Sequence, residues 1–176
     1  MAEDTDTGQA ASDGPDGAAN SAESEPAAEP SLLLNSHYIK DLSFENPHAP
    51  LIYGEMQKGP TIDVNIDVDL NHLQDQLHEV VLKLRVKATI GETVAFLVEL
   101  DMGGLATIGK HVSAGDRERL LITEVPRYLF PFARATVSDM TRDGGFPPLL
   151  INPISFEELY RNRKEQDLQM AEAAGA

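Results

Sequence analysis

The sequence predicts a domain of the α+β class, in which strands come first along the chain and helices follow. Two observations lead to this prediction. Four segments between residues 37 and 102 alternate apolar and polar side chains, which is the period of a half-buried strand. Beyond residue 103 the apolar spacing becomes helical, with glycine and proline at the boundaries. Strands grouped before helices, rather than interleaved with them, favour an antiparallel sheet.

The strongest strand signal is Thr61–Leu70, where apolar side chains alternate without interruption with acids and an asparagine. Successive side chains of a strand point to opposite faces, so one face is apolar and the other carries Asp63, Asp67 and Asp69. The other expected strands are His37–Glu45, Leu77–Ile90 and Thr93–Met102. Because short links join the last three of the four, we expect these to form an antiparallel meander.

Basic residues of the third strand are expected to face the acids of the second on the solvent side of the sheet. They are Lys83, Arg85 and Lys87. Cross-strand pairs of this kind contribute about 0.2–1 kcal/mol each. Most of these charges are therefore expected to stabilise the sheet rather than bind a partner.

Helices are expected in the second half of the chain. A short helix around Asp116–Ile122 precedes a longer one that begins at Pro126 and ends at Gly144-Gly145. Proline suits the first turn of a helix, and glycine commonly follows the last turn. Pro131 falls inside the longer helix, where it must remove a backbone hydrogen bond and bend the helix.

The two ends of the chain differ from its middle. Ser155 and Glu158 have the spacing of a capping box and predict the start of a last helix, which should fray beyond about Gln166. Residues 1–30 contain eight acids, no Lys or Arg, and no Leu, Ile, Val or aromatic residue. Such a segment buries too little apolar surface to fold, so we expect a disordered extension at 1–30, a domain at 31–165 and a flexible tail at 166–176.

Composition excludes several functions. The net charge of −15 argues against nucleic acid, whose phosphates require a basic surface. Without the first 30 residues, 21 acids still outnumber 14 bases. The chain has no Cys, which excludes disulfides and thiolate sites, and no stretch approaches the roughly 20 apolar residues of a membrane span. We therefore expect a soluble cytoplasmic protein that does not insert into membranes.

No catalytic or metal motif is complete. Gly104–Lys110 has the glycine and lysine spacing of a phosphate loop, but His111 stands where a magnesium-binding Ser or Thr is required. His72 and His78 flank a turn that can bring them together, yet no third metal ligand is evident. We expect no cofactor, no metal and no enzymatic activity. A small enzyme with an unrecognised site is kept as an alternative.

Surface character is the remaining functional signal. Asp41 and Glu45 are four residues apart on a strand and so share a face at a separation of about 13 Å. Leu97 and Glu99 likewise share a face of the fourth strand. Such acids either keep the protein soluble or form a docking surface, and the pattern alone does not distinguish the two.

Several blocks of residues occur in an order that resembles the SecB family of protein-export chaperones. The first spans Tyr38 to Pro50, with Lys40, Asp41, Ser43, Phe44, Glu45, Pro47 and Ala49 in place. The others are Glu79–Leu82, Ala95–Glu99, Gly103-Gly104, Leu129–Arg134, Gly145–Pro147 and Asn152–Phe156. Together they cover essentially the whole ordered part of the chain.

The resemblance implies a cytoplasmic homotetramer, a dimer of dimers, with a four-stranded antiparallel sheet and two main helices on one face of each subunit. Such a chaperone holds precursor proteins unfolded without ATP and delivers them to the SecA motor ATPase. The resemblance also implies that an acidic face of the sheet binds the basic, zinc-bearing C-terminal tail of SecA. The residues implied for that face are Asp41, Glu45, Leu97 and Glu99.

Two further sets of residues follow from the resemblance. Val98, Leu100 and Met102 correspond to positions associated with tetramer assembly. A groove for unfolded clients is implied near Tyr53, Met56, Phe96, Leu105 and Ile108. A related alternative is a SecB-like chaperone that stabilises an antitoxin or another client that is not exported.

Overall fold

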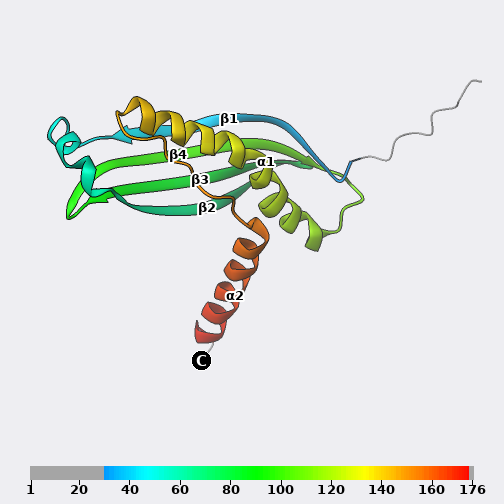
Figure 1. Cartoon of the computed structure of the whole chain (residues 1–176). Coiled ribbons are helices and arrows are strands. Elements are labelled where there is room, and N and C mark those ends of the chain that lie inside the picture. Colours follow the sequence, from blue (N-terminus) through cyan, green and yellow to red (C-terminus); the bar gives the residue numbers. More distant parts are fainter. Residues whose placement is uncertain (1–29, 175–176) are drawn as a thin grey trace, which may run out of the picture.

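The computed structural model describes residues 30–174, which form one sheet and two α-helices (Figure 1). The strands are β1 (Leu32–Glu45), β2 (Thr61–Gln74), β3 (Leu77–Ile90) and β4 (Thr93–Ile108). The helices are the 3-10 segment η1 (Leu51–Lys58), α1 (Ala114–Asp143) and α2 (Phe156–Ala174). The α+β class is therefore confirmed, while residues 1–29 of the acidic extension expected at 1–30 lie outside the described residues.

The sheet is antiparallel throughout, with strand order β1-β4-β3-β2. The predicted meander from β2 to β4 is thus confirmed. β1 pairs with β4, so the two strands that η1 connects form the opposite edges of the sheet. β3 has its predicted bounds, whereas β1, β2 and β4 extend beyond theirs.

The two faces of the sheet differ in cover. On the inner face, α1 lies across the strands and buries the apolar set of β3 and β4 (Figure 1). That set is Val80, Leu82, Leu84, Val86, Phe96, Val98, Leu100 and Met102, each at most 3% exposed. The opposite, outer face carries most of the charged side chains of the sheet. This division follows directly from the period-two pattern of the strands.

β4 continues through Gly103-Gly104, which corrects the strand end expected at Met102. Each glycine allows a close approach on one face of the sheet. A Cβ atom at Gly103 would lie 2.6 Å from the ring of Tyr38, and one at Gly104 would lie 3.1 Å from Leu129 of α1. The glycines therefore mark crowded positions inside the strand and not its end.

α1 is one helix of 30 residues where two were expected. Pro126 and Pro131 both lie inside it, so it lacks two backbone hydrogen bonds. Its inward side chains, among them Val125 and Leu129, are fully buried against the sheet. Burial of each large apolar side chain contributes roughly 1.5–3 kcal/mol, which offsets the lost bonds. Ser113, which the sequence reading overlooked, caps the helix by accepting a hydrogen bond from the Asp116 amide at 3.2 Å.

α2 begins with the predicted capping box, in which the Glu158 amide donates to Ser155 Oγ at 3.3 Å. It packs against α1 and projects away from the sheet beyond β2 (Figure 1). The prediction of two helices on one face is therefore right for α1 and wrong for most of α2. α2 also continues to Ala174, past Gln166 where fraying was expected. Within residues 30–174, no helix is long and apolar enough to cross a membrane.

Candidate partner-binding surfaces

Acids gather on the outer face where β1 and β4 lie side by side. The register places Asp41 opposite Asp101 and Glu45 opposite Leu97. Glu99, whose side chain is 56% exposed, lies on the same face between Leu97 and Asp101. The structure thus brings together all four residues predicted for this surface. Asp101, which was not predicted as a site residue, joins them, and we call these five residues the acidic face.

A bulge in β1 controls which side chains reach this face. Ile39 pairs with Met102 and Asp41 with Asp101, so Lys40 is an extra residue without a partner. The extra residue shifts the alternation, and Tyr38, Lys40 and Asp41 all lie on the outer side. Strict alternation along His37–Glu45 would put Tyr38 on the face opposite Asp41, together with Leu42 and Phe44, and the bulge moves it to the outer side.

The cations of β3 pair differently from the prediction. Arg85 turns toward β4, where it lies 2.7 Å from Asp101 and 3.7 Å from Glu99. Only Lys83 meets an acid of β2, at 2.5 Å from Asp69. Lys87 makes no ion pair within the described part of the chain.

Arg85 therefore neutralises the β4 acids of the acidic face, Glu99 and Asp101, but not its β1 acids, Asp41 and Glu45. Among residues 30–174, no Lys, Arg or His lies within ion-pair distance of Asp41 or Glu45. Both acids are exposed. Unpaired exposed carboxylates on a flat sheet surface attract a cationic partner more than they stabilise the subunit.

A buried carboxylate lies beside the acidic face. Glu79 of β3 accepts hydrogen bonds from Tyr38 at 2.5 Å, from Lys40 at 2.8 Å to each oxygen, and from Asn71 at 3.0 Å. The Lys40 ammonium and then the Tyr38 hydroxyl lower the pKa of Glu79 to about 2. The same contact with the Glu79 carboxylate raises the pKa of Tyr38 to about 12.

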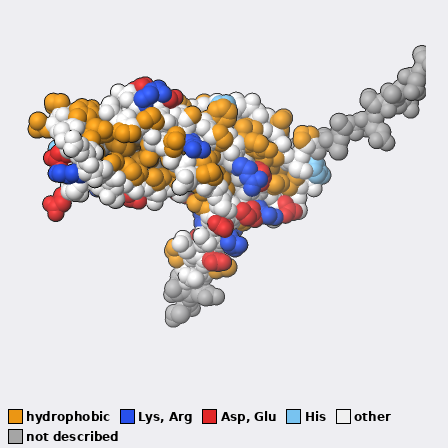
Figure 2. Space-filling view, viewed as in Figure 1, with side chains coloured by type: hydrophobic (Ala, Val, Ile, Leu, Met, Phe, Trp, Pro, Cys, Tyr) orange, Lys and Arg blue, Asp and Glu red, His pale blue; other side chains and the backbone are white. Residues whose placement is uncertain are grey.

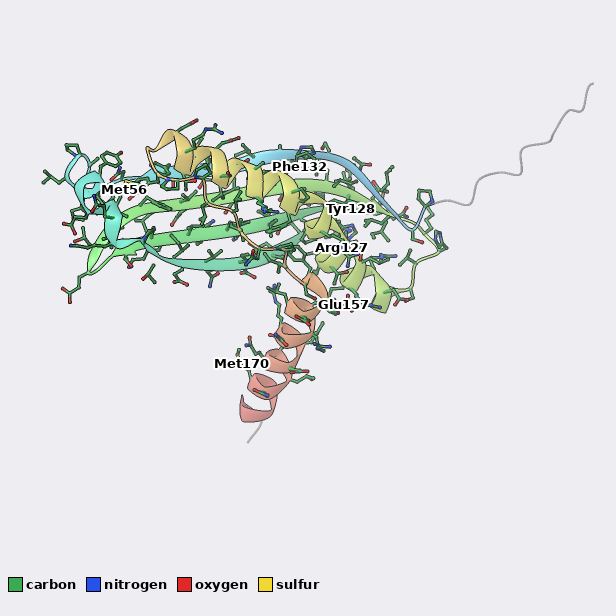
Figure 3. The ribbon with its side chains drawn as sticks, in the orientation of Figure 1. Met56, Arg127, Tyr128, Phe132, Glu157 and Met170 are labelled. Carbon is green, nitrogen blue, oxygen red and sulfur yellow. The ribbon has the colours of Figure 1, made fainter. Side chains whose placement is uncertain are left out.

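An apolar cleft of about 200 Å³ opens at the end of the sheet near η1. Phe96 forms part of its wall, together with Met56, Ile62, Ile90 and the segment 146–149. The centroids of the Phe96 and Phe146 rings lie 4.8 Å apart, and the Tyr53 ring is tilted against Phe146 with 5.4 Å between centroids. The predicted groove residues Tyr53, Met56 and Phe96 thus all lie around Phe146. Figure 3 shows Met56 at this end of the sheet, on η1.

The other two predicted groove residues lie elsewhere. Ile108 is 12 residues along β4 from Phe96, which corresponds to about 40 Å of extended strand. It is fully buried, and Leu105 lies on the outer face, opposite Glu79. The segment Gly104–Ile108 lies beyond the strand end expected at Met102 but is part of β4, and within one subunit it does not line the aromatic cleft.

The free edge of β2 is a second candidate binding surface, and both apolar and polar side chains line it. Two clefts, of about 280 and 530 Å³, separate α2 from this edge, and Arg163 of α2 lines both. Arg163 donates a hydrogen bond to the Val68 carbonyl at 2.9 Å and lies 3.7 Å from Asp67. The Val68 amide donates a hydrogen bond to Asp67 Oδ1 at 2.8 Å. The backbone groups of this edge are therefore only locally capped.

The middle of α1 exposes two aromatic side chains on its outward side. Tyr128 is 54% exposed and Phe132 47% exposed, near the middle of the helix (Figure 3). Phe132 stacks on His37 of β1 at 4.1 Å, and Ile39 and Leu150 are also exposed. Figure 2 shows hydrophobic side chains gathered over this part of the molecule. Val98, Leu100 and Met102, predicted for tetramer assembly, lie beneath α1 in the core instead of on this surface.

The remaining sequence patterns form no site in the described residues. The near-match to a phosphate loop is part of β4 up to Ile108. His72 and His78 pair across the β2–β3 hairpin with 5.0 Å between ring centroids, as the turn predicted. Within residues 30–174, no three His, Cys, Asp or Glu side chains are grouped to hold a metal ion.

Comparison with known proteins agrees with this arrangement. The family model described as preprotein translocase subunit SecB matches residues 25–167. The protein-export protein SecB of Parvibaculum lavamentivorans is 46% identical over 145 residues, covering 82% of this chain and 86% of the relative. That of Rhodospirillum rubrum is 43% identical over 148 residues, covering 82% and 89%.

Among solved structures, a SecB-like chaperone of Mycobacterium tuberculosis in complex with a peptide from the HigA1 antitoxin has the same fold. Its TM-score is 0.61 at 14% identity, covering 71% of this chain and 91% of the other. The sequence matches carry the family assignment, and they agree with the resemblance read from the blocks of residues. This chain belongs to the SecB family of protein-export chaperones, which are not enzymes.

Proposed function

We propose that this chain holds precursor proteins unfolded in the bacterial cytoplasm, without ATP, and delivers them to the SecA motor for export. The proposal rests on one observation above the others. Asp41 and Glu45 lie exposed beside Glu99 on the outer sheet face, without an ion-pair partner among residues 30–174, and the subunit also exposes an apolar cleft. A surface for a cationic partner and a separate surface for non-native chains are what such a carrier needs.

The acidic face is the proposed docking surface for the basic, zinc-bearing C-terminal tail of SecA. The zinc ion belongs to that partner, and this chain contributes carboxylates and the apolar side chain of Leu97. Complementary charge speeds association and fixes orientation, and it weakens as salt rises. Arg85 holds Glu99 and Asp101 in place, which leaves Asp41 and Glu45 as the acids that are free to pair with the tail.

Client binding is proposed for the aromatic cleft and the β2 edge. An extended chain can insert apolar side chains between Met56 and Phe146. It can also add backbone hydrogen bonds to β2 where Arg163 now caps Val68. Each large apolar side chain contributes roughly 1.5–3 kcal/mol before ordering costs, so a single site binds weakly.

A homotetramer, a dimer of dimers, is proposed because one subunit leaves two interfaces open. The outer edge of β1 has no strand partner within residues 30–174, and α1 exposes Tyr128 and Phe132. Val98, Leu100 and Met102 contribute indirectly, since they support α1 from beneath. Several weak client sites on one particle raise avidity by about 10²–10⁴-fold, which suits a binder of many sequences.

Light scattering of the purified chain, alone and with an unfolded precursor, tests this proposal. We expect the mass of four subunits alone, and a larger mass when a denatured precursor is diluted into the sample. The same precursor, once folded, is expected to leave the mass unchanged, because its apolar side chains are already buried. A monomer that ignores the denatured chain would contradict the proposal.

A second candidate function is stabilisation of an antitoxin. It is favoured by the shared fold of the Mycobacterium tuberculosis chaperone, which was solved with an antitoxin peptide. The 41–46% identity to export proteins favours export instead. Competition between a precursor and a toxin–antitoxin pair distinguishes the two, since the preferred client displaces the other.

A further inference from the structure

A lysine stands next to the acidic face and yet does not neutralise it. Lys40 and Asp41 are adjacent in sequence, and the bulge in β1 puts both on the outer side of the sheet. An ammonium group on a flexible stem beside an exposed carboxylate would ordinarily pair with it. Lys40 instead reaches across β4 to Glu79 of β3, 2.8 Å from each carboxylate oxygen.

Glu79 is built to hold this lysine. Its side chain is only 12% exposed, and it receives two more hydrogen bonds, from Tyr38 and Asn71. The reach across β4 is open because Gly103 has no side chain, so the Tyr38 ring lies over the strand. Tyr38 and Lys40 of β1 and Asn71 of β2 therefore fix the position of one carboxylate on β3, which in turn fixes the Lys40 ammonium.

We propose that Glu79 is a positioning residue that withdraws Lys40 from Asp41, so that the acidic face keeps its negative charge for a cationic partner. This inference rests on the proposed docking of the SecA tail on that face. With Lys40 held at Glu79, Arg85 is the one cation among the described residues that forms ion pairs with any of the four acids of the face. If Lys40 turned to Asp41, a second cation would enter the face, and one of its two unpaired acids would be occupied.

The consequence is measurable as tail affinity. The probe is the zinc-loaded C-terminal tail peptide of SecA, titrated into the full-length chain at low salt. Glu79→Gln keeps the shape of the side chain but releases Lys40, and we expect binding to weaken about 3- to 10-fold, as expected for one added charge at short range. Lys40→Met combined with Glu79→Gln should restore wild-type affinity. Glu118→Gln is the matched control, because it frees Lys164 between α1 and α2 and should leave tail affinity unchanged.

Loss of net charge must be separated from movement of Lys40. Glu79→Asp keeps the charge but draws the carboxylate back by one methylene, so it should also weaken binding, by about 2- to 5-fold.

Three results would overturn the inference. The first is that Glu79→Gln binds the tail with wild-type affinity. The second is that Glu79→Asp binds with wild-type affinity while Glu79→Gln binds weakly. The third is that the double variant Lys40→Met with Glu79→Gln binds as weakly as Glu79→Gln alone. Thermal unfolding of each variant shows whether a weak binder is still folded, and the double variant decides the question even if stability falls. If the wild-type chain itself does not bind the tail, the proposed docking surface fails first, and that result is distinct from the other three.

Discussion

Gly103 lies directly beneath the ring of Tyr38, and a Cβ atom there would come 2.6 Å from the Cε2 and Cζ atoms of that ring. The glycine is therefore the reason that Tyr38 can cross β4 and donate to Glu79 at 2.5 Å. Three separate blocks of the family pattern, at residues 38–50, 79–82 and 103–104, meet in this one contact. These blocks are far apart in sequence but form one structural unit on the outer face of the sheet.

Gly103→Ala is expected to destabilise the subunit. The methyl group cannot fit without moving Tyr38 or bending β4, and overpacking of this kind costs about 1–3 kcal/mol. Urea unfolding followed by circular dichroism measures the free energy. Gly115→Ala is the matched control, because nothing lies within 4 Å of its Cβ position and alanine favours the first turn of α1. Equal unfolding free energies for Gly103→Ala and the wild type would contradict the contact.

Acid should destabilise the protein through Glu79. Its pKa is about 2 in the folded chain, below its usual value of 4.5. A carboxyl group whose pKa is lowered by folding contributes its full stabilisation above pH 4.5, and the contribution is lost as the pH falls toward 2. We expect the unfolding free energy to drop by roughly 1–2 kcal/mol over that range through this group, after screening by solvent.

The Glu79→Gln variant measures how much of the acid-dependent loss of unfolding free energy comes from the Glu79 carboxylate. The variant should be less stable than the wild type at neutral pH, and the difference between the two should shrink as the pH approaches 2. A difference that stays constant with pH would show that the Glu79 carboxylate is not the group that titrates.

Much of the sheet could be predicted because the period of a strand fixes its faces. The alternation in Thr61–Leu70 and in β3 placed each side chain on its correct side. Four site residues, Asp41, Glu45, Leu97 and Glu99, were brought to one face as expected. The ion-pair partners of the β3 cations could not be predicted. Arg85 has acids on both neighbouring strands, and the alternation of side chains along a strand does not say which of them it contacts.

The errors share a physical cause, which is that local signals have more than one structural use. Gly103-Gly104 was interpreted as a strand end, although glycine also serves where Tyr38 or Leu129 approaches the backbone. Pro126 was interpreted as a helix start, but burial of α1 against the sheet outweighs the missing hydrogen bond. The bulge had one visible marker, since Lys40 interrupts the apolar set of β1.

Asp41→Lys combined with Glu45→Lys should abolish most binding of the SecA tail while leaving client holding intact. The two reversals change the charge of the acidic face by four units, and we expect affinity at low salt to fall about 10- to 100-fold. Isothermal titration with the tail peptide measures this loss, and suppression of precursor aggregation measures client holding.

The matched control for this charge reversal is Asp63→Lys combined with Glu92→Lys. It makes the same change in net charge at exposed acids on β2 and in the β3–β4 turn. This control should bind the tail almost as the wild type does. Equal losses in both double variants would mean that overall charge, and not the acidic face, attracts the tail.

Met56→Glu should weaken client holding without unfolding the subunit. Met56 lines the apolar cleft beside Phe96 and Phe146, so a carboxylate there would face an apolar client segment. We expect client affinity to fall about 5- to 20-fold, which corresponds to 1–2 kcal/mol. Leu51→Glu is the control from the same 3-10 helix, because Leu51 is 84% exposed and does not line the cleft. Similar losses in both variants would place client binding outside the cleft.

Phe132→Asp should break the assembly while leaving each subunit folded. Phe132 is half exposed on α1, so a folded monomer tolerates the change, but a carboxylate buried between two copies of α1 would lack a partner. Light scattering should show a particle of half the wild-type mass or less, with unchanged circular dichroism. Met170→Asp is the control, since Met170 is 65% exposed near the end of α2, away from this surface (Figure 3). If Phe132→Asp keeps the wild-type mass, the exposed side of α1 is not the interface. The free edge of β1 would then have to carry the assembly by itself, which predicts dimers and no larger particle.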